Sequence, residues 1–135
     1  MPQLNAILET CLYVDDLPAA EAFYSEVLGL ECFGRQEHRH VFFRCGRQML
    51  LLFNPETSEL IEPDSEIPPH GSRGPGHLAF AVAPAELDAW RDRLRKAGVA
   101  IELEFDWPQG GRSIYFRDPA GNSLEFATPN IWGIQ

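Results

Sequence analysis

A faint internal repeat constrains the fold of this chain more than any other feature of its sequence. The segments ETCLYV (Glu9–Val14) and HLAFAV (His77–Val82) both have the composition of a buried strand, and both end in valine. A helix-start signal follows each of them: two aspartates with Pro18 in the first half, and Pro84 in the second. The same order of elements is therefore expected twice along the chain.

The segments that follow these strands also match between the halves. Apolar residues at helical spacing predict helices over about 17–28 and about 84–97, which Gly29 and Gly98 end. The turns CGRQ and DPAGN predict a hairpin in each half. The strand-like runs are Glu31–Gly34, His40–Cys45 and Gln48–Phe53 in the first half, and Ala100–Phe105, Ser113–Arg117 and Ser123–Ala127 in the second.

The repeat predicts an α+β fold of two βαβββ modules within a single domain of residues 1–135. Module one is expected over about 4–54 and module two over about 76–129, with a C-terminal tail over 130–135. The segment 55–75 between the modules is rich in proline and has little periodicity. A connection of this length is usually functional or a linker, so we expect it to join the modules and to pass over a site.

Charge and composition exclude several classes of function. The chain has 135 residues, with 11 Lys and Arg against 20 Asp and Glu, so its formal net charge is -9. Such an acidic chain is poorly suited to binding nucleic-acid phosphates or anionic membranes. Three cysteines fit no zinc motif or disulfide framework, and we expect neither a signal peptide nor a membrane span. We therefore expect a cytoplasmic protein with reduced thiols.

Strand alternation places one polar residue at the start of the first strand in each half. Glu9 and His77 occupy equivalent positions of the repeat, on the face opposite to the apolar residues that are expected to meet the helices. In the last strand, Glu125 stands between Leu124 and Phe126, where an ionised carboxylate is costly without a partner. A divalent cation would be such a partner. Glu9, His77 and Glu125, with open positions for water or substrate, predict a catalytic metal site.

Further residues are expected around this site. If DPAGN forms a five-residue loop, Tyr115 pairs with Glu125 and stands beside the metal as a hydrogen-bond or proton donor. His40 is a candidate base from the first half. Arg112 is a candidate clamp for a substrate carboxylate, unless it only balances the charge of Glu125. The candidates to line an apolar pocket for a ring-bearing substrate are Phe53, Trp107 and Trp132.

Simpler interpretations of the same residues remain open. A glutamate at a strand start is commonly a solvated edge residue, and a buried histidine is commonly a hydrogen-bonded core residue. Glu125 could form a structural ion pair with Arg112 or Arg117. The agreement of three positions through one repeat favours the metal site over these alternatives.

Three stretches, YVDDLPAAEAFYSEVLGLE, GPGHLAFAV and GRSIYFRDPAGNSLEFATP, resemble the vicinal oxygen chelate superfamily. That superfamily includes glyoxalase I, extradiol dioxygenases, fosfomycin-resistance enzymes and bleomycin-resistance proteins. The resemblance implies a curved mixed sheet around one divalent metal ion (Fe, Mn, Ni, Zn or Mg) and a homodimer with sites shared between chains. It implies metal ligands at Glu9, where His or Gln is more usual, at His77 and at Glu125. Tyr115 also resembles a tyrosine that dioxygenases and fosfomycin-resistance enzymes keep near the metal.

The resemblance also bears on the reaction. Glyoxalase I carries a carboxylate in the last strand of its first module, where this chain has Leu50, which disfavours a typical glyoxalase I. A fosfomycin transferase needs a cationic pocket, for which Arg112 is the only obvious candidate in the second half. We therefore expect a metal-dependent lyase, isomerase or ring-cleaving dioxygenase that chelates a small substrate through neighbouring oxygens. The alternatives are a bleomycin-resistance-type dimer that binds a ligand without catalysis, and an acidic structural or regulatory protein.

Overall fold

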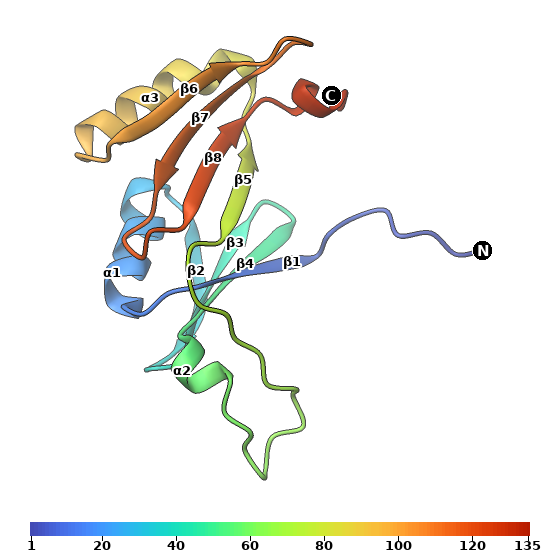
Figure 1. Ribbon diagram of the computed structural model, residues 1–135, viewed down its shortest axis with the longest axis vertical. Coiled ribbons are helices and arrows are strands. Elements are labelled where there is room, and N and C mark those ends of the chain that lie inside the picture. The colour runs from blue at the N-terminus through green and yellow to red at the C-terminus, as the bar shows by residue number, and fades with distance from the viewer. The chain divides into compact units, whose positions relative to one another are not determined.

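The computed structural model describes residues 1–135, which divide into two compact units, Met1–Arg73 and Gly74–Gln135. Each unit contains a four-stranded mixed sheet with a helix on one face (Figure 1). The strand orders are β1-β4-β3-β2 and β5-β8-β7-β6, so the two sheets have the same topology. In each sheet the first and last strands of the unit pair in parallel, and the other pairs are antiparallel.

The elements of the first unit follow the predicted order. The strands are β1 (Glu9–Tyr13), β2 (Glu31–Gln36), β3 (His40–Cys45) and β4 (Gln48–Phe53). The helices are α1 (Leu17–Ala22), which continues as a π-helical turn over Phe23–Val27, and α2 (Pro55–Ser58). The side chain of Asp16 accepts a hydrogen bond from the backbone of Ala19 and caps α1, as its position before Pro18 predicts.

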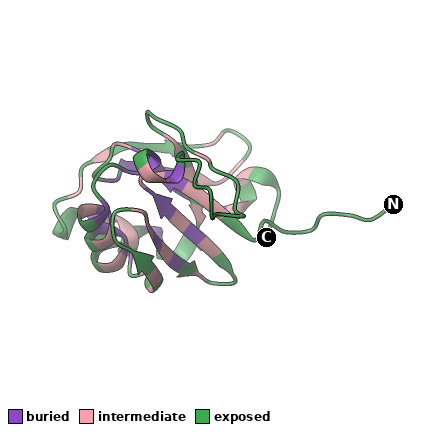
Figure 2. Ribbon diagram, turned by 90° about the horizontal axis from the view of Figure 1, so that it is seen from below, coloured by how far each residue is buried: buried purple, intermediate pink, exposed green.

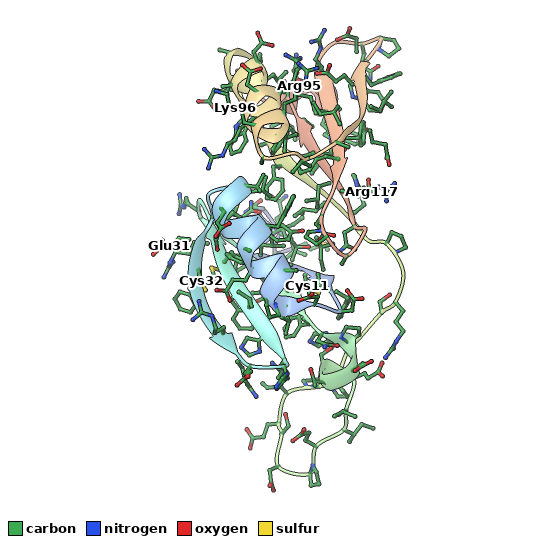
Figure 3. The ribbon with its side chains drawn as sticks, turned by 90° about the vertical axis from the view of Figure 1, so that its left-hand side faces the viewer. Cys11, Glu31, Cys32, Arg95, Lys96 and Arg117 are labelled. Atoms are coloured by element: carbon green, nitrogen blue, oxygen red, sulfur yellow. The ribbon has the colours of Figure 1, made fainter.

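The second unit repeats this order. Its strands are β5 (His77–Ala81), β6 (Ile101–Asp106), β7 (Arg112–Arg117) and β8 (Ser123–Ala127). Its helices are a 3-10 turn (Pro84–Glu86), α3 (Leu87–Lys96) and a C-terminal 3-10 turn (Pro129–Trp132). Arg95 and Lys96 lie in the last turn of α3, where positive charge stabilises the helix dipole (Figure 3). None of the helices in the chain has the length and apolar character required to cross a bilayer.

The predicted α+β fold and its strands are confirmed, while two short helical segments were not predicted. The helix α2 lies in the proline-rich segment, where the side chain of Asn54 accepts a hydrogen bond from the backbone of Glu56. The C-terminal turn Pro129–Trp132 begins at the last residue predicted for module two and continues into the predicted tail. Both segments have only four residues, which is too short for a periodic apolar pattern, and only their capping residue or proline marks them.

The two hydrophobic cores lie between each sheet and its helix. Alternate residues of the central strands point to the helix side and are at most 3 % exposed, as the buried stripes along the strands in Figure 2 show. They occupy equivalent places: Val41, Phe43, Leu50 and Leu52 in the first sheet, and Ile114, Phe116, Leu124 and Phe126 in the second. The other side of each sheet, which we call its open face, is the side on which Glu9 and His77 lie.

A bulge interrupts the same strand in each sheet. The pairing of β2 with β3 shifts between Cys32 and Gly34, so that Phe33 has no partner across the pair. The pairing of β6 with β7 shifts between Ile101 and Leu103, which leaves Glu102 in the same position. The start of β2, with Glu31 and Cys32, is labelled in Figure 3. Both bulges lie on edge strands, where an irregular backbone discourages pairing with another chain.

Candidate functional site

His77 and Glu125 meet on the open face of the second sheet. His77 is the first residue of β5 and lies beside Ser123 of β8, and Ala79 lies beside Glu125. The imidazole Nε2 of His77 is 3.3 Å from the carboxylate Oε1 of Glu125. The side chain of Glu125 is 7 % exposed and that of His77 is 53 % exposed. The pair therefore combines an anchored carboxylate with an imidazole that solvent or a substrate can reach.

The hydrogen bond of the second ring nitrogen, Nδ1, decides which nitrogen of His77 carries the proton in the neutral ring. Its Nδ1 is 2.9 Å from the carbonyl oxygen of Ser123, and because a carbonyl only accepts, Nδ1 carries the proton of that hydrogen bond. In the neutral ring, Nε2 then presents its lone pair toward a carboxylate oxygen of Glu125. Two facing acceptors require a proton or a cation between them. This donor set, one imidazole nitrogen and one carboxylate oxygen with room on the open side, fits a divalent metal ion.

Glu125 is held from its other oxygen. The hydroxyl of Ser113, which is completely buried, donates a hydrogen bond to Glu125 Oε2. The same hydroxyl accepts a hydrogen bond of 2.8 Å from the indole Nε1 of Trp107. We did not predict Ser113, although its place two residues before Tyr115 on the same strand puts it on the open face. Trp107 was predicted as a pocket residue, and here its indole supports the carboxylate.

The DPAGN turn holds the start of β5. Asp118 accepts hydrogen bonds from the backbone of Ala120 and Asn122, at 3.0 and 2.9 Å. The side chain of Asn122 accepts a hydrogen bond of 2.7 Å from the backbone of Gly76, the residue before His77. Asn122 is 1 % exposed, so this contact is shielded from water. The turn thus fixes the backbone on both sides of the contact between His77 and Ser123.

Tyr115 stands next to this pair in the predicted register. It lies directly beside Glu125, and Arg117 lies beside Ser123, which confirms the pairing expected from a five-residue DPAGN loop. The ring of Tyr115 stacks on that of His77 at a centroid distance of 6.5 Å. Burial and the neighbouring charge of Glu125 raise the pKa of Tyr115. Its phenol therefore keeps its proton near neutral pH and is a hydrogen-bond donor.

The arginines do not join the cluster. Arg112 binds the carboxylate of Asp106, with Nε 2.7 Å from Oδ1, and both residues lie on the helix side of the sheet. Arg112 therefore balances Asp106 and not Glu125, and its role as a clamp for a substrate carboxylate stays a prediction. Arg117 pairs with Glu102 at 3.1 Å. Neither arginine forms the alternative ion pair with Glu125, because each has a carboxylate on β6 as its partner.

Glu9 occupies the equivalent of His77 in the first unit. It is the first residue of β1, it is exposed, and it shares the open face with Cys11 and Tyr13. Within each unit, no group of three His, Cys, Asp or Glu side chains gathers to form a complete metal site. His77 and Glu125 are thus brought together, and the role of Glu9 stays a prediction.

Leu51, and not Leu50, is the counterpart of Glu125. In the second sheet Glu125 lies beside Ala79, two residues after His77, and in the first sheet Leu51 lies beside Cys11, two residues after Glu9. Leu50 is 2 % exposed and faces α1, so the matching position is the next residue along the strand, within the one-residue register that the sequence left open. Since Leu51 is also apolar, the first sheet still has no carboxylate at this place.

His40 and Phe53 lie in an aromatic cluster on the open face of the first sheet. The ring of His40 stacks on Phe42 at 4.0 Å, and the ring of His70 meets Phe53 edge-on at 4.5 Å. Burial and the charge of Arg39 lower the pKa of His40, so its ring is neutral near pH 7. Phe53 is only 5 % exposed beneath these rings. Their roles as base and as pocket residue stay predictions.

The surroundings of His40 and Trp132 bear on their predicted roles. His40 borders a cavity of about 790 Å³ in the first unit, together with Asp15, Asp16 and Asn54. Trp132 is 79 % exposed at the end of the C-terminal turn, so it covers no surface of its own unit, and its role in substrate binding stays a prediction.

Comparison with known proteins supports the interpretation of these sheets. The crystal structure of a lactoylglutathione lyase from Agrobacterium tumefaciens matches with a TM-score of 0.96 and 46 % identity, over 98 % of this chain and 100 % of that one. A protein described as glutathione transferase FosA from Serratia marcescens is 30 % identical over 125 residues, which are 90 % of this chain and 79 % of that protein. A metallothiol transferase FosB from Bacillus licheniformis is 30 % identical over 120 residues, 88 % of this chain and 72 % of that protein.

These relatives are named as enzymes, and their names cover both lyase and transferase reactions. The lyase shares its fold with this chain. The model of one family matches residues 5–126, nearly the whole of the repeat. The chain therefore belongs to the glyoxalase/bleomycin resistance protein/dioxygenase superfamily.

Proposed function

We propose that this protein is a divalent-metal-dependent enzyme that binds a small substrate through neighbouring oxygens. The observation that carries the proposal is the contact of 3.3 Å between Nε2 of His77 and Oε1 of Glu125, with each ligand held by a further hydrogen bond. A structural ion pair alone would not require both partners to be oriented in this way. The open side of His77 leaves space for further ligands and for the substrate.

We propose His77, Glu125 and Glu9 as the three protein ligands of the metal. Two carboxylates and one imidazole form a harder, more oxygen-rich set than the two histidines and one carboxylate typical of iron oxygenases. This set favours Mn, Ni, Zn or Mg over Fe. When bound, the metal supplies Lewis-acid stabilisation of the negative charge that develops on a substrate oxygen. We therefore favour lyase, isomerase or transferase chemistry over ring cleavage with oxygen.

Tyr115 is proposed to act on the substrate from the side of Glu125. Its raised pKa keeps the phenol protonated, so it donates a hydrogen bond or a proton and does not remove one. Its place beside Glu125 and its stacking on His77 put the hydroxyl on the open face that the substrate would occupy. His40, with its lowered pKa, is the proposed base, and Phe53 and Trp132 are proposed to contribute apolar surface.

We further propose that the two modules act as one domain and that the protein works as a homodimer. Exposed apolar side chains on the open face of β6, Leu103 and Phe105, support an assembly that covers them. The names of the relatives point to a substrate with an oxygen-bearing group and, for lyase or transferase chemistry, to glutathione or another thiol as a partner.

The proposal is tested by elemental analysis of untagged protein that is purified without chelator, followed by titration of the metal-free protein. We expect about one first-row metal ion per chain. The loaded protein is then assayed for formation or breakdown of lactoylglutathione and for addition of glutathione to fosfomycin. If no metal is bound and none is taken up on titration, the proposal is overturned.

A second candidate is a ligand-binding dimer without catalysis. The observation that favours it is that neither unit gathers three metal-binding side chains by itself. The aromatic rings of Phe42, Phe53, His40 and His70 would then supply stacking surface for a planar ligand. Stoichiometric metal that is lost in a His77→Ala variant would exclude this candidate.

A further inference from the structure

We infer that Trp107 and Ser113 are positioning residues that present a single oxygen of Glu125 to the metal, an inference that rests on the proposed function. The three side chains form one chain of hydrogen bonds, from the indole of Trp107 through the hydroxyl of Ser113 to Oε2 of Glu125. The other oxygen, Oε1, is the one that faces His77. The carboxylate thus has one oxygen that Ser113 holds and one that faces His77.

The direction of each hydrogen bond is fixed by chemistry. An indole N–H only donates, so the hydroxyl oxygen of Ser113 accepts from Trp107. The single proton of that hydroxyl is then left for Glu125, whose ionised oxygens only accept. Accepting from the indole polarises the hydroxyl and strengthens the bond that it donates. Trp107 therefore acts on Glu125 without touching it.

The loop before β7 holds Trp107 in place. The backbone of Trp107 donates to the carbonyl of Gly111 at 3.0 Å, and that of Gly110 donates to the carbonyl of Trp107 at 2.9 Å. Gly111 has a φ of 89°, and a Cβ atom there would lie 2.5 Å from Ile131. The ring of Phe105 packs edge-on against Trp107 at 4.8 Å. A tight glycine turn and an aromatic neighbour thus restrict the indole to one orientation.

This arrangement has a consequence for the geometry of metal binding. The hydrogen bond from the buried hydroxyl of Ser113 holds Oε2 and leaves Oε1 as the oxygen that faces the same place as Nε2 of His77. We therefore infer that Glu125 binds through Oε1 alone and that its orientation is set before the metal arrives. Loss of a hydrogen bond that orients a metal ligand typically lowers metal affinity by about 10- to 100-fold.

The inference is tested with Ser113→Ala and Trp107→Phe. Binding of Zn²⁺ to the metal-free proteins is measured by calorimetry, and folding is checked by urea denaturation of each variant. We expect the affinity to fall by about 10- to 100-fold in Ser113→Ala and by about 10-fold in Trp107→Phe. Ser113→Thr keeps the hydroxyl and should restore most of the affinity. The matched controls are Trp90→Phe, a tryptophan of α3 that packs on Phe126 at the helix side of the sheet, and Ser58→Ala, a buried serine of the first unit; both should bind Zn²⁺ as the wild type does.

A second readout follows the indole itself. The N–H resonance of Trp107 is assigned in a two-dimensional NMR spectrum by its absence from Trp107→Phe. It should shift in metal-free Ser113→Ala, and it should shift again in the wild type on addition of Zn²⁺, because the metal draws charge from Glu125. Trp90 and Trp132 serve as internal references in the same spectrum.

The outcomes separate this inference from the proposed function. A wild type that takes up no Zn²⁺ overturns the proposed function and with it the positioning role. A wild type that binds Zn²⁺ while Ser113→Ala and Trp107→Phe bind it equally well overturns the inference and leaves the proposed function intact. Equal losses in Ser58→Ala and Ser113→Ala would show a general effect of destabilisation and would also overturn it.

Discussion

At the place where the second sheet has Glu125 beside Ala79, the first sheet has Leu51 beside Cys11. The neighbouring strands differ in the same way: Tyr115 and Ser113 of β7 correspond to Phe42 and His40 of β3. One open face thus carries a hydrogen-bonded polar cluster, and the other carries packed rings and leucine. The same backbone supports both, so the chemistry of a face is decided by its side chains and not by its topology.

The helix sides of the two sheets differ far less. Leu50 corresponds to Leu124, Phe43 to Phe116 and Val41 to Ile114, and all are almost completely buried. Packing at interior density leaves little freedom for changes of volume, whereas a face open to solvent or substrate is free to change. The comparison teaches that the two halves agree where side chains pack between sheet and helix and differ on the open faces.

The largest effect is expected on metal binding, in which the open faces of the two sheets should differ most. His77→Ala removes one of the two proposed ligands that lie together, so we expect metal affinity to fall by more than about 100-fold. The change is measured by calorimetric titration of the metal-free protein. Phe42→Leu, which alters the counterpart of Tyr115 in the first sheet, is the control and should bind as the wild type does. Retention of stoichiometric, tightly held metal in His77→Ala would mean that His77 is not a ligand.

The next prediction compares how much the two hydrophobic cores contribute to stability. Leu50→Ala and Leu124→Ala each remove a leucine that is at most 2 % exposed and leave a cavity. We expect each variant to lose about 2–5 kcal/mol of unfolding free energy, measured by urea denaturation. The two losses should agree within about 1 kcal/mol, the margin set by local relaxation. A markedly smaller loss in one variant would show that its sheet packs less tightly on its helix.

A substitution that introduces a carboxylate into the first sheet tests why only the open face of the second sheet holds one. Leu51→Glu puts the charge of Glu125 at the equivalent place, where the counterpart of Ser113 is His40, which has no hydroxyl. We expect a loss of about 1–3 kcal/mol in the metal-free protein, because the carboxylate is partly buried among apolar groups. Leu51→Gln separates the cost of charge from that of polarity. Unchanged stability would show that water solvates this face freely.

The smallest effects are expected at two equivalent arginines. Arg117 pairs with Glu102 at 3.1 Å, while Arg44 lies over the ring of Phe33 at 4.7 Å. Both contacts are exposed, so Arg117→Ala and Arg44→Ala should each lower the midpoint of urea denaturation only slightly. High salt should reduce the cost at Arg117 more than the cost at Arg44, because part of the Arg44 contact is apolar. The opposite order would show that Glu31, 4.0 Å from Arg44, dominates there.

Much of the fold could be predicted from periodicity alone. Strands His40–Cys45, Gln48–Phe53 and Ser123–Ala127 were predicted with the bounds that the structure has, because alternation and turn residues mark their ends. The register of Tyr115 beside Glu125 followed from the length of one turn. The meeting of His77 and Glu125 was expected from the internal repeat and from the family resemblance.

Other features depend on contacts that local sequence does not encode. The offset of a parallel pair is set by the crossover through a helix, so the choice between Leu50 and Leu51 could not be made from a turn length. Arg112 is bound to Asp106 through the pairing of β6 with β7, across a glycine turn. The hydrogen bonds from Trp107 through Ser113 to Glu125 cross the same turn, and the spacing of these residues in the sequence does not predict them.

The bulges of β2 and β6 carry a consequence for the history of the molecule. Sheet pairing does not require either one, yet each stands at the same place, and each unpaired residue, Phe33 or Glu102, lies against the equivalent arginine. Protection of an edge strand explains why each sheet has a bulge but does not explain why both bulges have the same position. We take the shared bulge as a sign of gene duplication: one ancestral half-chain was duplicated, and both copies kept the bulge while the side chains of their open faces changed.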